Sequence, residues 1–480
     1  MVGNDYYVKI HGHSCLEFKS ENSLILFDPW LCGSAYWRSW WNFPEPSPIE
    51  SITKNISSVK DVYIYITHLH WDHFHGPTLR KLNNTIPNLK FLISKVPETR
   101  LRDDLINVLN KRNSIIEINH GEKYEINSNL SLKPFLSGPV LTDSAVLIQY
   151  KNDFVLNLND SKQQSLMSKQ IISNIGDGNL KLMLRSHSSA NSRICIRNRD
   201  GSEKQNNDKS KDIYSKEFFN AALLFKPQVA IPFASNMCYL HKDSYRYNNN
   251  SNTSDLVLKF YETIKAQDKF NLKLVLPGEK IDLRNLMTTT NKHSRNQLFS
   301  DRDSELNKYR LKFIEKLKKD EKRQESNSFS ELIINNYFQI IFSKLPFYIR
   351  ILSRGQIAFV EKNNSGKKNN FKVDIFNKKL LFNNASLKEC HTLIYVKPGV
   401  LNSALSQKNL NSLGISKLLE IHTSSVKKYN IFFLLCISAE IGSCPFITFK
   451  QLLRSLRIWV KRWREVVDYF LIFFGIKNLI

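Results

Sequence analysis

The sequence predicts an α/β protein in which two β-sheets are sandwiched between helices, followed by a smaller α+β domain. In the first 290 residues, short β-branched and aromatic segments alternate with segments whose apolar residues recur every three or four positions. These are the patterns of strands and of amphipathic helices. The chain has 480 residues, 42% of them hydrophobic, which is longer than one compact core usually spans. We therefore expect a first domain at 1–290, a charged linker at 291–330, an α+β domain at 331–425 and basic amphipathic helices at 426–480.

The predicted elements of the first domain begin with a hairpin. Its strands, and those that follow, are expected at 6–18, 24–28, 61–66, 90–94, 114–118, 130–135, 145–150 and 154–159. Helices are expected at 98–109, 161–173, 214–225 and 254–266. This order fits two sheets between helices, with loops gathered along one edge.

A cluster of histidines follows the strand expected at 61–66. Residues 67–76 read Thr-His-Leu-His-Trp-Asp-His-Phe-His-Gly. Imidazole and carboxylate are ligands for zinc, and also for iron and manganese. A loop at the end of a strand can direct several side chains to one point. The sequence therefore predicts a metal site here, and a histidine-rich surface loop is the alternative.

The spacing His-x-His-x-Asp-His, formed by His68, His70, Asp72 and His73, resembles the signature of the metallo-β-lactamase superfamily. The first 290 residues resemble the branch that contains ascorbate-phosphate lactonase, and especially the hydrolase-like portion of CMP-N-acetylneuraminate hydroxylase. The stretches that carry this resemblance are 12–15, 24–30, 154–160 and 231–235. The resemblance implies a four-layer αββα sandwich.

The resemblance also implies a site for two ions. His68 and His70 would hold the first ion, Asp72 and His73 the second, and Asp160 would lie between them. A divalent ion lowers the pKa of its bound water from about 15.7 toward roughly 7, and Asp72 could orient that water or accept its proton. We expect Zn²⁺, with Mn²⁺ or Fe²⁺ as alternatives, and a single ion remains open.

Two positions that carry histidine in the superfamily do not carry it here. The segment 131–150 contains none, and Ala234 occupies the other position. His241 is a candidate replacement ligand, with a surface role as the alternative. His187 is a candidate substrate-binding residue from a neighbouring loop. For His13, beside a glycine in the first hairpin, we expect packing or support of a ligand rather than ligation.

The segment 30–43 is rich in tryptophan and tyrosine. Trp37 is our candidate for one wall of a substrate pocket, because aromatic rings often line such pockets. Core packing is the alternative.

The net charge of +25 predicts an anionic partner. A phosphorylated small molecule or an acidic membrane surface ranks above nucleic acid, because no basic and aromatic stripe accompanies the motif. Seven cysteines without regular spacing indicate reduced thiols and a cytoplasmic location. We expect no transmembrane segment, because the apolar runs fall short of about 20 residues.

The C-terminal part offers two further hypotheses. The α+β domain resembles sterol-carrier-like domains, which hold apolar ligands, and a purely structural module is the alternative. In the tail, apolar residues at helical spacing between 449 and 470 alternate with lysines and arginines. Such a helix either binds a membrane surface or docks onto the protein's own core.

The expected function is that of a metal-dependent hydrolase. Its water would attack a phosphorylated, nucleotide-activated or lipid-linked sugar, a phosphodiester or a lactone. We expect no iron–sulfur cluster, because a Rieske site needs both C-x-H and C-x-x-H motifs and only Cys238 to His241 supplies one of these. Two alternatives stay open: a non-hydrolytic or partner-dependent component of nucleotide-sugar modification of the CMP-sialic-acid type, and a peripheral protein of the inner membrane face with a structural metal.

Overall fold

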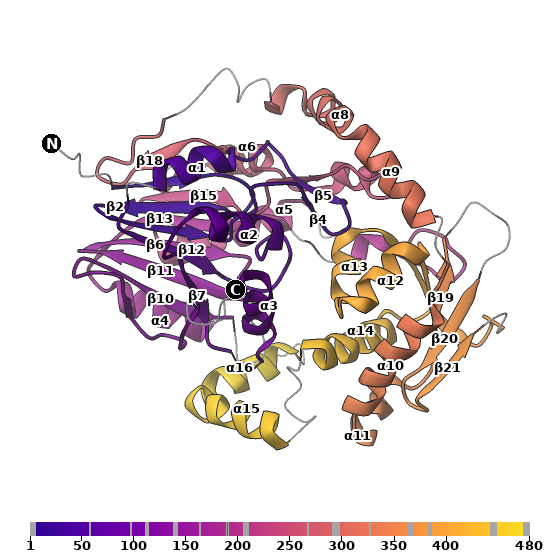
Figure 1. Ribbon diagram of the computed structural model, residues 1–480. Helices are drawn as coiled ribbons and strands as arrows, with labels where there is room; N and C mark the ends of the chain where they lie inside the picture. The colour runs from indigo at the N-terminus through magenta and orange to yellow at the C-terminus, as the bar shows by residue number, and fades with distance from the viewer. Residues whose placement is uncertain are drawn as a thin grey trace.

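The computed structural model describes most of the chain, namely residues 6–56, 59–96, 98–110, 115–137, 143–162, 165–188, 190, 192–204, 211–265, 268–289, 298–325, 328–362, 369–382, 386–441 and 449–473. Its first part contains two stacked seven-stranded sheets, drawn in indigo and magenta in Figure 1. In order across the first sheet, the strands are β18 (Lys280–Asp282), β1 (Tyr6–Ile10), β2 (Leu16–Ser20), β3 (Ser23–Phe27), β6 (Asp61–Ile66), β7 (Lys90–Ser94) and β8 (Ile115–Ile118). Those of the second are β17 (Asn271–Leu272), β15 (Val229–Phe233), β13 (Asn179–Ser186), β12 (Asp153–Asn159), β11 (Ser144–Tyr150), β10 (Leu130–Leu136) and β9 (Tyr124–Glu125).

Helices cover the outer face of each sheet. Strand β3 is buried at all five positions, because alternate residues of a strand point to opposite faces and both faces are covered. Ile25 and Phe27 join the core between the sheets, whereas Leu24 and Leu26 join the core shared with the first group of helices. These helices are α1 (Ile49–Ile56), α2 (Gly76–Thr85) and α3 (Arg100–Leu109). The second sheet is covered by α4 (Ser165–Ile175), α5 (Lys211–Phe225) and α6 (Ser254–Thr263). The predicted four-layer αββα sandwich is thereby confirmed.

Parallel strands bring the loops of the site to one edge. β3, β6, β7 and β8 run parallel in one sheet, and β12, β13 and β15 run parallel in the other. The carboxyl ends of such strands are where ligands usually bind. The histidine-rich loop follows β6 and Asp160 follows β12, so both lie at this edge.

The second unit is built around a six-stranded sheet, shown in orange in Figure 1. Its strands, in order, are β14 (Ile196–Arg197), β23 (Leu419–Thr423), β22 (Cys390–Val396), β19 (Gln356–Glu361), β20 (Asn370–Asp374) and β21 (Lys379–Phe382). Its helices are α10 (Glu331–Lys344), α11 (Phe347–Arg350), the 3₁₀ turn η3 (Ile351–Ser353), α12 (Pro398–Ser406), α13 (Asn411–Ser416) and α14 (Val426–Ile441).

This unit is larger than the predicted range 331–425. β14 comes from the first 290 residues and pairs in parallel with β23. α14 packs on α10, where Tyr337 donates a hydrogen bond to Glu440 at 2.7 Å. The structure therefore places the end of the unit at the end of α14.

The predicted linker is helical where it is described. α8 (Arg302–Lys312) and α9 (Ile314–Glu325) follow residues 290–297, so the predicted boundary at 291 lies outside the described residues. Tyr309 and Leu317 pack on Trp41 and Phe43 of the aromatic segment. The linker thus covers one side of the first domain.

The tail forms two helices instead of one. α15 (Phe449–Lys461) and α16 (Trp463–Phe473) meet at Arg462, and the predicted positions beyond 473 lie outside the described residues. Among the described residues, none of the helices combines the length and hydropathy needed to cross a bilayer.

Candidate metal centre

The histidine-rich loop is held tightly between β6 and α2. The backbone N–H of Phe74 donates to the carbonyl of His70 at 2.7 Å, which closes a turn around Asp72. His75 caps α2, because its side chain accepts a hydrogen bond from the backbone N–H of Thr78. His68, Asp72 and His73 are consequently buried at the end of the strand. The loop itself thus fixes where these donors point.

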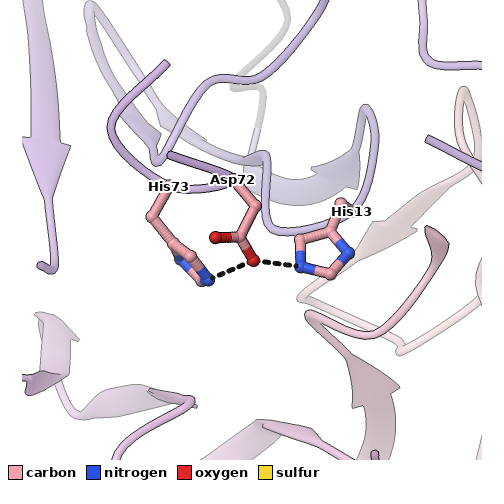
Figure 2. A group of neighbouring side chains, drawn as sticks. All are labelled: His13, Asp72 and His73. Carbon is pink, nitrogen blue, oxygen red and sulfur yellow. Dashed lines mark hydrogen bonds and ion pairs between the residues drawn. The ribbon is translucent and has the colours of Figure 1, made fainter. Parts of the chain in front are cut away.

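The loop donors converge with Asp160. The rings of His68 and His73 are 4.1 Å apart between centroids. Nε2 of His73 lies 3.4 Å from a carboxylate oxygen of Asp72 and 3.4 Å from one of Asp160. Two groups of three donors, each with its atoms within 4.8 Å of one another, could hold an ion: His13, Asp72 and His73, and His68, His73 and Asp160. Figure 2 shows the first group, with Asp72 between the two rings.

Hydrogen bonds to Asp28 orient the ring of His73 directly and that of His68 through Thr67. One of its oxygens accepts from the backbone N–H of Thr67 at 2.7 Å, and the other from the Thr67 hydroxyl at 2.6 Å. The second oxygen is also 3.0 Å from Nδ1 of His73 and bonded to the amide of Asn159. The Thr67 hydroxyl in turn lies 3.0 Å from Nδ1 of His68. A carboxylate behind a metal-binding histidine fixes its ring orientation and raises its basicity.

The protonation states suit a metal site. Burial, together with His73 nearby, lowers the pKa of His68 well below its usual value, so its imidazole is neutral. Its Nε2 is buried and has no hydrogen-bond partner among the described groups, which is costly unless something else binds it. Burial opposes ionisation of Asp72 and Asp160, but His73 lowers the pKa of both carboxyls, with His13 assisting at Asp72. Neutral imidazole and ionised carboxylate are the ligand forms that Zn²⁺, Fe²⁺ and Mn²⁺ need, so these residues fit such an ion.

The pKa of His73 is shifted in the opposite direction to that of His68. Burial lowers its pKa, but the carboxylates of Asp72, Asp160 and Asp28 raise it well above the usual value. In the absence of a cation, these carboxylates favour the protonated form of the His73 imidazole. Metal binding at this nitrogen should release that proton.

Two other predicted ligands, His70 and His241, are not in either group of converging donors. His70 is beside His68, with ring centroids 4.7 Å apart, but its Nε2 faces the Asn411 amide at 3.3 Å. The structure does not bring His241 to the cluster. Its Nε2 is 3.2 Å from Gln324 on α9, and its Nδ1 accepts from the backbone of Asp243. His241 therefore packs against α9 and does not reach the other donors.

His187 lies close enough to His13 and Asp160 to interact with both electrostatically, and neither of its ring nitrogens has a hydrogen-bond partner among the described groups. Burial, with the His13 ring next, lowers the pKa of His187 to about 3, so it is neutral. Trp37 is half-buried, its ring is tilted against that of Trp71 with centroids 5.1 Å apart, and its indole N–H donates to the Ser403 hydroxyl of the second unit at 2.9 Å. Its position between the two units fits the packing alternative of the sequence analysis.

Two residues of the site were not predicted to be ligands: His13, for which we expected packing or support of a ligand, and Tyr36. Nε2 of His13 lies 3.1 Å from Asp72, and the Tyr36 hydroxyl donates to the other Asp72 oxygen at 2.5 Å. The position of His13, in the turn between β1 and β2, is the sequence feature that could have indicated its place in the site. Tyr36 has a positive φ of 51° within the aromatic segment, and no pattern marked it.

A small cavity adjoins these donors. Its volume is about 30 Å³, and its lining includes His13, Trp40, Asp72, Asp160, Ser188 and Tyr239. That volume accommodates one or two water molecules. Ala190 also lines the cavity, and its carbonyl accepts a hydrogen bond from the Lys417 ammonium of the second unit at 3.0 Å.

These features define the class of the protein. The two stacked sheets, with the His-x-His-x-Asp-His loop after β6 and Asp160 after β12, give the chain a metallo-β-lactamase fold. No family model matches the chain. Over 162 residues the chain is 31% identical to cytidine monophosphate-N-acetylneuraminic acid hydroxylase of Xenopus laevis. The matched segment covers 33% of this chain and 26% of that protein. The chain spans about a quarter of the length of this curated relative.

Two solved structures are similar in fold. One is described as a possible metal-dependent hydrolase, from Veillonella parvula. The identity is 13%, the match covers 58% of this chain and 99% of that chain, and the TM-score is 0.40. The other is a metallo-β-lactamase fold protein from Bacillus subtilis, with 13% identity, 57% and 97% covered, and a TM-score of 0.34.

Proposed function

We propose that the chain is a metal-dependent hydrolase whose site activates water against an anionic substrate. The observation that carries this proposal is the convergence of His68, His73, Asp72 and Asp160, with Nε2 of His68 left without a hydrogen bond. Zn²⁺ is our first choice, and Mn²⁺ or Fe²⁺ also suit the nitrogen and oxygen donors. Such an ion would supply a water with a pKa near 7 and a Lewis acid for a phosphoryl or acyl oxygen.

Asp72 is the residue that we assign to proton transfer. It borders the cavity, and the hydrogen bonds from Tyr36 and His13 fix its carboxylate. Because its pKa is held low by His73 and His13, it is ionised and able to orient a water molecule or accept its proton. The net charge of +25 favours anionic substrates, among which we include phosphorylated, nucleotide-activated or lipid-linked sugars, phosphodiesters and lactones.

A second candidate is a non-hydrolytic or partner-dependent role in CMP-sialic-acid-type modification. The similarity to the Xenopus hydroxylase favours it. The C-x-x-H pair of this chain is used in packing, because Cys238 lies in the core against Leu306 and Tyr309 and His241 contacts Gln324. We therefore do not assign an iron–sulfur cluster to these residues.

Elemental analysis of the purified protein, joined to a screen of phosphodiesters, lactones and nucleotide sugars, tests the proposal. We expect one or two bound divalent ions and turnover that falls at least about 100-fold in Asp72→Ala and His73→Ala. His391→Ala is the matched control, since His391 lies in the second unit against Thr392. Full turnover in Asp72→Ala would refute the hydrolase. Stoichiometric binding of a CMP-sugar without turnover would favour the second candidate.

A further inference from the structure

Exposed apolar side chains lie on two segments at the lower edge of the molecule in Figure 1, α11 with η3 and α15 with the start of α16. We call these side chains together the apolar face and define it by Phe347, Tyr348 and Leu352 of α11 and η3, and Leu456, Val460 and Trp463 of α15 and α16. All six are exposed, with Val460 at 70% and Trp463 at 59%. Figure 1 shows α11 and α15 along the same lower edge, with α14 above them, and α14 contacts η3. Large apolar side chains gathered in this way mark an interaction surface.

We propose that this apolar face docks onto a bilayer that contains anionic phospholipids. α15 has the sequence Phe-Lys-Gln-Leu-Leu-Arg-Ser-Leu-Arg-Ile-Trp-Val-Lys, with four cations and no acid. A helix with apolar residues on one face and lysine or arginine on the other lies in the lipid interface, with its apolar side in the acyl boundary. Arg354, beside η3, is also exposed. The positive charge around the apolar face complements a negative lipid surface.

Contacts at the elbow between α15 and α16 leave three described apolar side chains of this segment in solvent. At the elbow between α15 and α16, the buried Arg462 donates to the carbonyl of Leu136 at 3.1 Å and pairs with Glu465. The amide of Gln170 on α4 donates to Glu465 at 3.4 Å. These polar contacts fix the elbow while the apolar side chains of Leu456, Val460 and Trp463 stay in solvent. Docking onto the core, the other reading of this helix, therefore does not cover them.

A basic groove opens beside the elbow. It has a volume of about 540 Å³ and lies between α4 and the start of α16, with Lys169, Lys461 and Arg464 among its lining residues. The Arg464 guanidinium stacks 5.4 Å from the centre of the Trp463 ring. Cations around an amphipathic ring at the edge of an apolar surface match the depth of lipid phosphates.

Charge also argues against a second copy of the chain as the occupant. A twofold dimer places the same patch on both partners. Such a dimer through the apolar face would bring Arg457, Lys461 and Arg464 toward their own copies. Like charges held together in an interface are unfavourable.

Sedimentation of the full chain with phosphatidylcholine vesicles, with and without phosphatidylserine, tests the proposal. We expect binding only to the anionic vesicles and weaker binding at high salt. Val460→Ser combined with Trp463→Ser should weaken vesicle partitioning at least tenfold. The matched control is Ile213→Ser with Met287→Ser, which removes two exposed apolar side chains elsewhere and should leave partitioning unchanged.

A second set of variants tests the charge. Changing Arg457, Lys461 and Arg464 together to glutamine should weaken partitioning by about 100-fold, since each cation near an anionic surface contributes about fivefold. The control changes Lys318, Lys319 and Lys322 of α9 to glutamine and should have little effect. Equal binding to neutral and anionic vesicles, or equal losses in variants and controls, would overturn the proposal. So would concentration-dependent dimerisation, in light scattering, that Val460→Ser abolishes while no vesicle binding occurs.

Discussion

The side-chain amide of Asn411 lies 3.3 Å from Nε2 of His70, although the two residues are 341 positions apart in the chain. Asn411 begins α13 in the second unit, and His70 belongs to the loop after β6. An asparagine amide can donate or accept a hydrogen bond. It can therefore hold one nitrogen of the ring while Nδ1 remains available to an ion, as outer hydrogen bonds commonly do for metal-binding histidines.

Asn411→Leu should weaken metal binding about 10- to 100-fold, because His70 would lose the group that orients its ring. Metal titration of the apoprotein measures this. Gln407→Leu, at the exposed end of α12, is the control and should bind metal like the unaltered chain. Unchanged affinity in Asn411→Leu would show that His70 takes no part in ligation or needs no such support.

Asp28→Asn should lower metal affinity by a similar factor and also destabilise the fold. The carboxylate accepts hydrogen bonds from Thr67, His73 and Asn159, and an amide would turn an N–H₂ group toward one of these donors. Metal titration measures the loss of affinity, and thermal unfolding measures the loss of stability. Asp61→Asn, at the start of β6, should change neither.

Tyr36→Phe should reduce the free energy of unfolding by about 1–3 kcal/mol. The hydroxyl donates to Asp72 and accepts from the backbone N–H of Trp71 at 3.1 Å, so its removal leaves two buried groups unsatisfied. Burial, with Asp72 next, raises the pKa of Tyr36 well above its usual value, so this donor keeps its proton at working pH. Denaturant unfolding measures the loss. Tyr245→Phe, whose exposed hydroxyl bonds Asn307, should cost less than about 0.5 kcal/mol.

Glu440→Gln should make the protein more stable at pH 8 and less sensitive to pH. Burial raises the pKa of Glu440 from 4.5 to about 7, although Tyr337 and the Leu410 N–H oppose this. The folded state therefore holds a proton that the unfolded state releases, and stability falls as the pH rises from about 4.5 through 7. The loss is on the order of 3 kcal/mol. Glutamine keeps the acceptor oxygen and cannot ionise.

Unfolding at pH 5 and pH 8 checks this sign. The difference between the two pH values should be smaller in Glu440→Gln than in the unaltered chain. Glu389→Gln, at an exposed position, is the control. A larger difference in Glu440→Gln would mean that the carboxyl is ionised in the folded protein.

A feature could be predicted from the sequence where all of its residues lie in one short segment. The loop from His68 to His73 is contiguous, and its geometry follows from one turn after a buried strand, so the cluster could be predicted. Asp160 was placed at the site by the resemblance to the metallo-β-lactamase superfamily, and in the structure it follows β12 at the same edge. The layers of the first domain followed from strand and helix periodicity, with differences of a few residues, as at the start of α3.

The remaining features depend on contacts between distant segments. Tyr36 and Asn411 approach the site only because the aromatic segment and the second unit fold over it. His241 contacts Gln324 on α9 and not the other donors. A contact between segments so far apart in the chain cannot be predicted from a local sequence pattern. The tail was predicted as one helix because its apolar period continues through Arg462, whereas the structure divides it there, at the residue whose side chain bonds the Leu136 carbonyl.

The short strand β14 has a consequence for how the chain can be divided. It belongs by sequence to the first domain, yet it forms an edge of the second sheet, where Ile196 and Arg197 pair with Ile421 and His422. An expression clone that starts near residue 331 would leave β23 with an open edge, which invites self-association. The two halves of this polypeptide are thus better regarded as one cooperative folding unit, and a fragment of either half is a poor surrogate for the whole.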